Sequence, residues 1–330
     1  MSILTTLHGV GSTLLSNLFI TLPYPEETPV LSDKTIIVTG SNTGLGLEAS
    51  RHLLRLGVGK LIMAVRNLDK GEKARAELLQ SSQQHSDTIE VWHLDMSSYD
   101  SVKNFAARAN DTLLRLDTVL ANAGMMATKF SVAEDNERTI TVNVVSTFLL
   151  LLLLLPKLRQ SPFPGKFVIP NSAMHYWAPI KELIPEEKPG TIFSRLNDPE
   201  KAIMASRYEV SKLIALYLTR ELAARITASD KPTAIVNTPN PNYCKSELLR
   251  DVQTPAPPDF LARTTEMGSR ALVHGVLAGL ESNGQYLTNC HVQEPACHVT
   301  NKTGVQIQRA VFKELMEKLE IVLPGISNNI

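Results

Sequence analysis

The chain has 330 residues, 43% of them hydrophobic, and its 33 Lys and Arg residues balance 33 Asp and Glu residues. This composition is typical of a globular protein with a substantial core, and the zero net charge gives no electrostatic case for a nucleic acid or an anionic membrane as partner. Three cysteines, Cys244, Cys290 and Cys297, are too few for a disulfide framework and favour a reducing, cytoplasmic location. Their spacing fits no zinc pattern, so no metal site is expected.

Residues 1–32 are predicted to be an N-terminal extension ahead of the folded domain. Residues 3–22 are mildly apolar but interrupted by polar side chains, which is a poor match to a signal peptide or a membrane span. The apolar run 148–155 is too short to span a membrane and predicts a buried helix, so no transmembrane span is expected. Residues 1–22 could contact a membrane surface, dock on the folded domain or cover the substrate pocket.

From residue 33 onward, β-branched runs alternate with segments of helical periodicity. The expected strands are 35–39, 60–66, 90–95, 117–121, 165–169, 233–237 and 285–287; the expected helices are 45–56, 69–80, 98–115, 134–158, 208–226, 260–280 and 303–319. This alternation predicts one domain over 33–330, a doubly wound, Rossmann-type parallel sheet of about seven strands with helices on both faces. The proline-rich segment 177–206 is interpreted as a lid over the substrate rather than a core element.

A glycine-rich loop, Thr39-Gly-Ser-Asn-Thr-Gly-Leu-Gly46, lies between the first strand and its helix. Its first glycine allows a tight turn, the second lets the backbone approach a pyrophosphate, and the third allows close packing of helix on strand. The helix N-terminus then offers free N–H groups to the phosphates. The pattern predicts a dinucleotide site, with contacts from Gly40, Asn42, Thr43, Gly44, Leu45 and Gly46.

The end of the second strand indicates which dinucleotide is bound. NAD-binding folds usually place an acidic residue there, to bond the ribose 2′-hydroxyl, whereas an arginine accommodates a 2′-phosphate. Here Arg66 is followed by Asn67, and no acid appears before Asp69. We therefore expect NADP(H) as cofactor, with Arg66 paired to the 2′-phosphate; a solvated surface arginine is the alternative.

The pair Tyr208 and Lys212 lies on one face of a predicted helix, because residues four apart are about one turn apart. A free tyrosine titrates near 10 and is a poor acid–base group at neutral pH, but a nearby ammonium favours the phenolate. Tyr208 could then give a proton to a ketone or take one from an alcohol.

Together these motifs resemble the short-chain dehydrogenase/reductase superfamily over about residues 33–290. The order and spacing match at the glycine loop, Asp95, Asn122-Ala-Gly124, Asn143, Ser172 and the Tyr208/Lys212 pair. The segments 40–44 and 64–67 are most similar to the retinol-dehydrogenase-like branch. The C-terminal stretch is similar to reductases of fungal secondary-metabolite pathways.

The resemblance implies a role for each catalytic residue. Ser172 would hydrogen-bond the substrate oxygen, and Tyr208 would be the general acid/base. Lys212 would hold the nicotinamide ribose and tune Tyr208, and Asn143 would anchor a water that relays protons toward Lys212. Each has a structural alternative: Asn143 could bridge helix backbone, and Ser172 could be an ordinary turn residue.

The resemblance also implies contacts on the adenosine side of the cofactor, from Asp95 to the adenine and from Asn122 to the adenosine. Asp95 could instead be an acid leading into the helix that follows. Related proteins often form homodimers through the helices that carry 143–158 and 208–226. The leucine run in the first of these would suit such an interface or an ordinary buried face.

Two positions depart from the family pattern. Pro170 removes a hydrogen-bond donor near the end of a central strand, so a displaced Ser172 is expected. After the sixth strand, where the family usually has Pro-Gly, this chain has Pro239-Asn-Pro-Asn-Tyr243, which puts Asn242 where a positive φ is needed. Asparagine tolerates that conformation best among non-glycine residues.

The side chains expected around the substrate are apolar and adaptable: Met125, Met174, His175, Trp177 and Tyr243. They predict a bulky, apolar small molecule, with ordinary packing beneath a loop as the alternative. The sequence thus favours an NADP(H)-dependent oxidoreductase that interconverts a ketone or aldehyde and an alcohol, on a secondary-metabolite intermediate. A cyclase or isomerase on the same fold, with a structural or absent cofactor, is the second hypothesis, motivated by Pro170 and Asn242.

Overall fold

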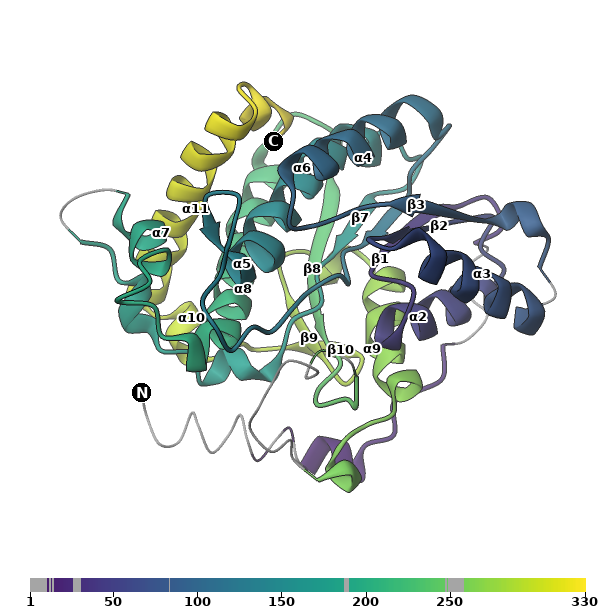
Figure 1. The fold of residues 1–330 in the computed structure, drawn as a ribbon, viewed down its shortest axis with the longest axis horizontal. Helices are drawn as coiled ribbons and strands as arrows, with labels where there is room; N and C mark the ends of the chain where they lie inside the picture. The colour runs from purple at the N-terminus through teal and green to yellow at the C-terminus, as the bar shows by residue number, and fades with distance from the viewer. Residues whose placement is uncertain are drawn as a thin grey trace.

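A twisted eight-stranded sheet forms the centre of the part of the chain that the structure describes (Figure 1). This computed structural model describes residues 11, 13, 15–25, 31–82, 84–186, 190–246, 248 and 258–330. The strand order is β10-β9-β8-β7-β4-β1-β2-β3. The bounds are β1 Thr35–Thr39, β2 Lys60–Val65, β3 Ile89–His93, β4 Thr118–Leu120, β7 Gly165–Val168, β8 Ala234–Asn240, β9 Tyr286–Thr288 and β10 His291–Gln293. The predicted doubly wound parallel sheet is confirmed, with one strand more than expected.

The extra strand, β10, pairs antiparallel with β9 through a two-residue turn. Both turn residues have positive φ, 48° at Asn289 and 62° at Cys290. Two-residue hairpins with positive φ at both central positions usually contain glycine. The Asn-Cys pair lacks that signal, which is why the sequence did not predict the hairpin.

Helices cover both faces of the sheet (Figure 1). On one face lie α2 Gly44–Arg55, α3 Leu68–Ser82 and α9 Thr265–Leu277; on the other lie α4 Tyr99–Thr112, α6 Ser146–Leu158 and α8 Arg207–Ala228. Shorter elements join them: η1 Ser86–Thr88, β5 Val132–Ala133, β6 Asn136–Glu137, α5 Arg138–Ile140, η2 Thr141–Val145, η3 Ala173–Tyr176, η4 Ile180–Leu183, α7 Thr191–Leu196, η5 Met204–Ser206, η7 Asp259–Leu261, η8 Leu280–Ser282 and α10 Cys297–Thr300. The chain ends with α11 Lys302–Val322 and η9 Ile326–Asn329.

The leucine run forms a buried helix, as the sequence predicts. Leu149, Leu150, Leu151, Leu154 and Leu155 are all 0% exposed, and α4 packs along α6. Among the described residues, one stretch, Arg138–Leu158, is long and apolar enough to cross a membrane, but 89% of its most apolar window is buried inside the protein. This favours an ordinary buried face over a dimer interface at α6. A homodimer through another surface stays a prediction.

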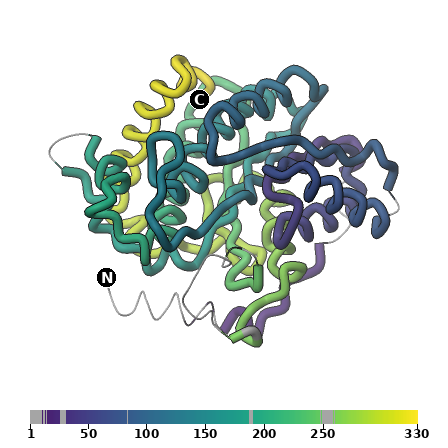
Figure 2. Tube along the Cα trace, viewed as in Figure 1, coloured from purple at the N-terminus to yellow at the C-terminus, as the bar shows by residue number. Residues whose placement is uncertain are grey.

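The described residues of the insertion, 177–186 and 190–206, contribute side chains to the main core. Leu183, Ile192 and Leu196 are fully buried, and the backbone N–H groups of Ile192 and Phe193 donate to the carboxylate of Glu314 on α11. Figure 2 shows the C-terminal segment (yellow) beside the teal segment of the insertion. The expectation that this segment stands apart from the core is therefore wrong, because its apolar residues are covered by a helix more than a hundred positions later. A lid function over the substrate stays a prediction.

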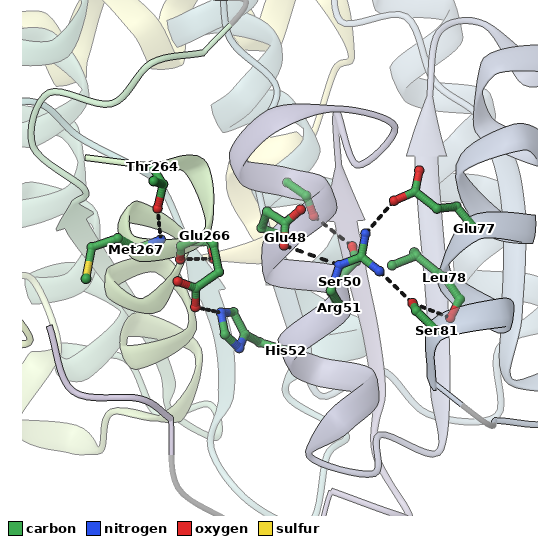
Figure 3. A network of polar contacts seen from close by, with 12 residues as sticks. Glu48, Ser50, Arg51, His52, Glu77, Leu78, Ser81, Thr264, Glu266 and Met267 are labelled. Atoms are coloured by element: carbon green, nitrogen blue, oxygen red, sulfur yellow. Dashed lines mark hydrogen bonds and ion pairs between the residues drawn. The ribbon is translucent and has the colours of Figure 1, made fainter. Parts of the chain in front are cut away.

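A polar network holds α2 between its two neighbours (Figure 3). Arg51 Nη2 lies 2.6 Å from Glu77 Oε1 on α3, and Arg51 also donates to Ser81. On the other side, His52 Nε2 lies 3.0 Å from Glu266 Oε1 on α9. Since α2 begins at the glycine loop, this network fixes the direction in which the helix N-terminus points.

Candidate active site

The glycine loop has the geometry that a phosphate cradle requires. Gly40 and Gly44 have φ of 62° and 58°, which favour glycine. A Cβ on Gly46 would lie 2.5 Å from Gly40 O, so only glycine fits there. Thr43 precedes α2 without a side-chain cap within the described structure, and the first turn of α2 contains no acid. The helix N-terminus is therefore free to bind an anion.

Asn122 holds this loop in place. Its Nδ2 donates to Thr39 O at 3.1 Å and to Gly40 O at 3.2 Å, and Thr39 Oγ1 accepts from Ala123 N at 2.8 Å. These bonds tie the end of β4 to the end of β1. The sequence assigned Asn122 to the adenosine side of a cofactor, whereas its amide nitrogen acts here on the loop backbone.

Arg66 and Asp95 lie at the ends of neighbouring strands, β2 and β3. Arg66 is exposed. Asp95 Oδ1 accepts from Ser97 N at 2.9 Å and from Ser97 Oγ at 2.7 Å, which is the turn role held open as the alternative. Burial raises the pKa of Asp95, but the Ser97 hydrogen bonds and the charge of Arg66 outweigh it and leave the pKa lowered. An exposed cation and an ionised acid thus lie at the ends of neighbouring strands.

Ser172, Tyr208 and Lys212 come together at the end of β7. Tyr208 is 7% exposed, and its hydroxyl is hydrogen-bonded to the Ser172 side chain. Lys212 Nζ lies 5.5 Å from the Tyr208 ring centroid and donates to Pro170 O at 2.8 Å. Burial raises the pKa of Tyr208, with the Ser172 bond opposing it, and burial lowers the pKa of Lys212 to about 8. The phenol therefore carries its proton at neutral pH.

Asn143 lies in η2, a π-helical turn, and such turns are frequent at functional sites. Its side chain exchanges two bonds with Met125, accepting from Met125 N and donating to Met125 O, both at 2.9 Å. Its Nδ2 also donates to Ser211 Oγ at 3.0 Å, and Ser211 Oγ donates to Tyr208 O at 2.7 Å. Asn143 thus ties the loop after β4 to the helix that carries Tyr208 and Lys212.

Pro170 leaves the pairing of β7 with β8 intact. The N–H groups of Ile169 and Asn171 donate to Asn237 O and Pro239 O on β8, at 2.9 and 2.8 Å. On the other side of β7, the pairing reaches one residue past the end of β4, because Ala121 N donates to Val168 O at 2.8 Å. Backbone hydrogen bonds are therefore kept on both sides of β7 up to the proline.

Asn242 adopts a φ of 62°, as the missing glycine predicts. Its backbone N–H donates to Asn240 Oδ1 at 3.0 Å, and its Oδ1 accepts from Asn240 Nδ2 at 2.7 Å. The neighbouring asparagine thus stabilises the left-handed conformation with two hydrogen bonds.

The predicted substrate residues do not all face a pocket. Met125, Met174, Trp177 and Tyr243 are half-buried around the site. His175 is 0% exposed: its Nδ1 donates to Ser172 O at 2.7 Å and its Nε2 accepts from Ala296 N at 3.2 Å. Burial lowers the pKa of His175 to about 3. His175 is thus a neutral structural residue that fixes the backbone of Ser172, which corrects its assignment to the pocket.

Three contributors were missed by sequence reasoning. Ser211 links Asn143 to Tyr208, and its position beside Lys212 was the available signal. Cys244 lies on the loop after β8 near Tyr208, and burial raises the pKa of its thiol to about 12, so it stays protonated. Ser246 lies beside the glycine loop, 3.8 Å from where a Cβ on Gly44 would be. The loop after β8 therefore runs from the tyrosine to the phosphate cradle.

Comparison with known proteins places this site in a family. The family model described as short chain dehydrogenase matches residues 34–173. The short chain dehydrogenase/reductase dmxR8 of Cryptosporiopsis sp. is 44% identical over 96% of this chain and 99% of its own length. The chain belongs to the short-chain dehydrogenase/reductase family. This confirms the resemblance that the motifs predicted, and with it an oxidoreductase family.

Further relatives of this short-chain dehydrogenase/reductase also come from fungi. The short chain dehydrogenase atnD of Emericella nidulans is 43% identical over 84% of this chain and 90% of its own length. The short-chain dehydrogenase anuD of Penicillium roqueforti is 39% identical over 96% of this chain and 84% of its own.

Solved structures share the fold at lower identity. The short chain dehydrogenase from Shigella flexneri is 20% identical with a TM-score of 0.59, covering 83% of this chain and 97% of the other. The alcohol dehydrogenase from Thermococcus sibiricus, in complex with 5-hydroxy-NADP, is 20% identical with a TM-score of 0.54, covering 78% and 96%.

Proposed function

We propose that this short-chain dehydrogenase/reductase is a cytoplasmic, NADP(H)-dependent enzyme that interconverts a ketone or aldehyde and an alcohol on a bulky small molecule of fungal secondary metabolism. The observation that carries the proposal is the buried Tyr208 hydroxyl, hydrogen-bonded to Ser172 and one helical turn from Lys212. The glycine loop follows β1 and Ser172 follows β7. Because both strands run parallel, the cradle and the acid lie at the same edge of the sheet.

The residues around the cradle fit a dinucleotide. Gly46 leaves no room for a side chain, the α2 N-terminus is uncapped, and Arg66 is exposed at the end of β2. A neighbour in fold carries an NADP derivative in its crystal structure. The nicotinamide, when bound, supplies or accepts the hydride.

In the reducing direction, the chain's own residues manage the proton and the charge. Ser172 Oγ hydrogen-bonds the substrate carbonyl oxygen and stabilises the negative charge that develops there. Tyr208 gives its proton to that oxygen, and the ammonium of Lys212 stabilises the phenolate left behind. Asn143 holds the loop after β4 in place against α8. A water bound at the π-helical turn of Asn143 would return a proton toward Lys212.

Replacing Arg66 by aspartate should change the cofactor preference. The variant loses a charge-assisted contact to the 2′-phosphate and gains an acid that can bond a ribose hydroxyl. The expected result is a rise of about tenfold or more in KM for NADPH, with KM for NADH unchanged or lower. Lys73→Asp is the control, since Lys73 is exposed on α3 and the charge change is identical. A wild-type enzyme that prefers NADH would overturn the assignment.

Carbonyl reduction should slow as the pH rises above about 8. Burial lowers the pKa of Lys212 to about 8, whereas burial raises that of Tyr208. Below this value both groups carry their protons. Above it Lys212 becomes neutral first and no longer stabilises the phenolate, so kcat/KM falls.

The measurement is the pH profile of kcat/KM with NADPH, on both sides of that value. Lys212→Arg, whose guanidinium keeps its charge, should move the fall to higher pH if the variant is active. A rate that climbs through the same window would contradict this reading of Lys212.

A further inference from the structure

The helical residues 15–19 of the N-terminal extension dock on the body through their polar side. Asn17 Nδ2 donates to Tyr243 O and to Leu261 O, both at 2.8 Å. Ser16 is 8% exposed, whereas Phe19 on the same helix is 78% exposed. Figure 1 shows this helix (purple) beside the bright green segment that contains η7. The side of the helix that contacts the folded domain therefore presents amide and hydroxyl groups. These side chains hold the helix by directional hydrogen bonds.

A buried arginine binds the end of this helix. Arg263 is 4% exposed, and its Nη2 donates to Ser16 O at 3.1 Å and to Ile20 O at 3.3 Å. Its Nη1 donates to Pro241 O at 3.4 Å. The last carbonyls of a helix attract cations, so the extension supplies part of the environment that keeps this guanidinium inside the protein.

Asn289 joins the extension to the loop after β8. Its Nδ2 donates to Ser16 Oγ at 2.9 Å, and its Oδ1 accepts from Arg263 Nη2 at 2.9 Å. The same Oδ1 accepts from Asn242 Nδ2 at 3.2 Å. Asn242 is the residue whose positive φ shapes this loop, so the extension is connected to it through one side chain.

The loop held in this way is an active-site wall. Backbone bonds between Tyr243 and Arg263, at 2.9 Å, and between Lys245 and Arg263, at 3.1 Å, fix it beside the arginine. Cys244 lies near Tyr208, and Ser246 lies beside Gly44 of the phosphate cradle. A shift of this loop would therefore change the surroundings of both Tyr208 and the glycine loop.

A polar cavity lies between the extension and the segment that follows Ser172. Thr13 and Ser16 line it from the N-terminal side, and Ala173 lines it from the catalytic side. The other lining residues are polar or aromatic: Tyr176, Asn240, Asn242, Tyr286, Thr288 and Gln293. Ala173 directly follows Ser172 in the chain, so the cavity begins one residue from the candidate catalytic serine. Amides and hydroxyls in such a cavity fix orientation by hydrogen bonding and discriminate for oxygen-bearing groups.

We propose that residues 13 and 15–20 of the N-terminal extension are part of the active site: they pin the loop after β8 through Asn17, Arg263 and Asn289, and they close a polar subsite that takes a hydroxyl group of the substrate. This rests on the function proposed above for the identity of the substrate. It refines the expected apolar pocket, because Asn240, Asn242 and Gln293 give the cavity amide groups.

The test uses the full chain with two variants and one control. Asn17→Ala removes the bonds to Tyr243 and Leu261 and keeps a good helix former. Asn289→Gly removes the bridge, and glycine tolerates the φ of 48° at that position. Phe19→Ala is the control, because it lies on the same helix with its side chain in solvent.

Two readouts separate this inference from the proposed function. Hydrogen exchange of residues 241–246 should accelerate in both variants and not in the control. Calorimetric titration in the presence of NADP⁺ should show 6-hydroxy-1-tetralone binding about tenfold more weakly to both variants, with a smaller change for 1-tetralone, which lacks the hydroxyl. Neither readout requires turnover, whereas failure of NADPH-dependent reduction of either tetralone would count against the function alone.

Unchanged exchange in both variants would overturn the pinning of the loop. A wild-type protein that binds the two tetralones equally, or binds neither, would overturn the polar subsite. If Phe19→Ala changed hydrogen exchange and ligand binding as much as the two variants, the assignment of the docking side to Ser16 and Asn17 would be overturned.

Discussion

Replacing Tyr208 by phenylalanine is expected to lower kcat for carbonyl reduction by about 10²- to 10⁴-fold, the usual contribution of a positioned general acid. The variant keeps the ring that packs at the site and loses the hydroxyl that is bonded to Ser172. Binding of NADPH should change little, because the phosphate cradle and Arg66 lie on other elements. Steady-state kinetics and a fluorescence titration of NADPH measure the two effects.

The matched control for this variant is Tyr217→Phe. Tyr217 is a buried tyrosine on the same helix, nine residues after Tyr208, and its hydroxyl donates to His298 O at 2.8 Å. It should lose about 1 kcal/mol of stability and keep its kcat. If Tyr208→Phe retained full turnover, Tyr208 would not be the proton donor.

Replacing Arg207 by alanine is expected to cost about 3–5 kcal/mol of unfolding free energy, the range for breaking a buried ion pair. Arg207 is 0% exposed and lies 3.7 Å from Glu137 Oε2 and 3.5 Å from Glu182 Oε2. Removing it leaves two buried carboxylates without their cation. Because Glu182 belongs to the insertion and Glu137 precedes the π turn, the loss should also loosen the contact between them.

Urea unfolding of both proteins provides the measurement. Burial raises the pKa of Glu182, and the charge of Arg207 opposes that rise, so the pKa rises further without the arginine. Acidification would then protonate Glu182 and reduce the penalty, which makes the deficit smaller at low pH than at neutral pH. Arg225→Ala removes an exposed pair with Glu221 and should cost about 1 kcal/mol or less. A similarly small loss of unfolding free energy for Arg207→Ala would show that the buried ion pair contributes little to stability.

The catalytic arrangement was readable from the sequence where the chemistry depends on local spacing. The glycine loop directly follows a β-branched strand, and Tyr208 and Lys212 are one helical turn apart. Ser172 and Asn143 came from the order of motifs along the chain. Asn242 was predicted to need a positive φ because a glycine is missing there, and the backbone confirms it.

Features that depend on distant partners were not readable. His175 looks like a pocket residue in the sequence, but bonds to Ser172 and Ala296 make it structural. The insertion is proline-rich and reads as a surface loop, although Glu314 on α11 binds its short helix. The docking of the extension depends on a buried Arg263 that no local pattern distinguishes from a surface arginine.

In the proposed reaction, hydride from NADPH is transferred to a carbonyl carbon of the substrate, and Tyr208 supplies the proton to its oxygen. The direct measurement is single turnover of a tetralone with NADPH carrying deuterium at C4, prepared separately on each face of the ring. The account predicts one deuterium on the carbinol carbon from one face, and one NADPH oxidised per product. Product formed without NADPH oxidation, and surviving in Tyr208→Phe, would contradict it and would favour a cyclase or isomerase on the same fold.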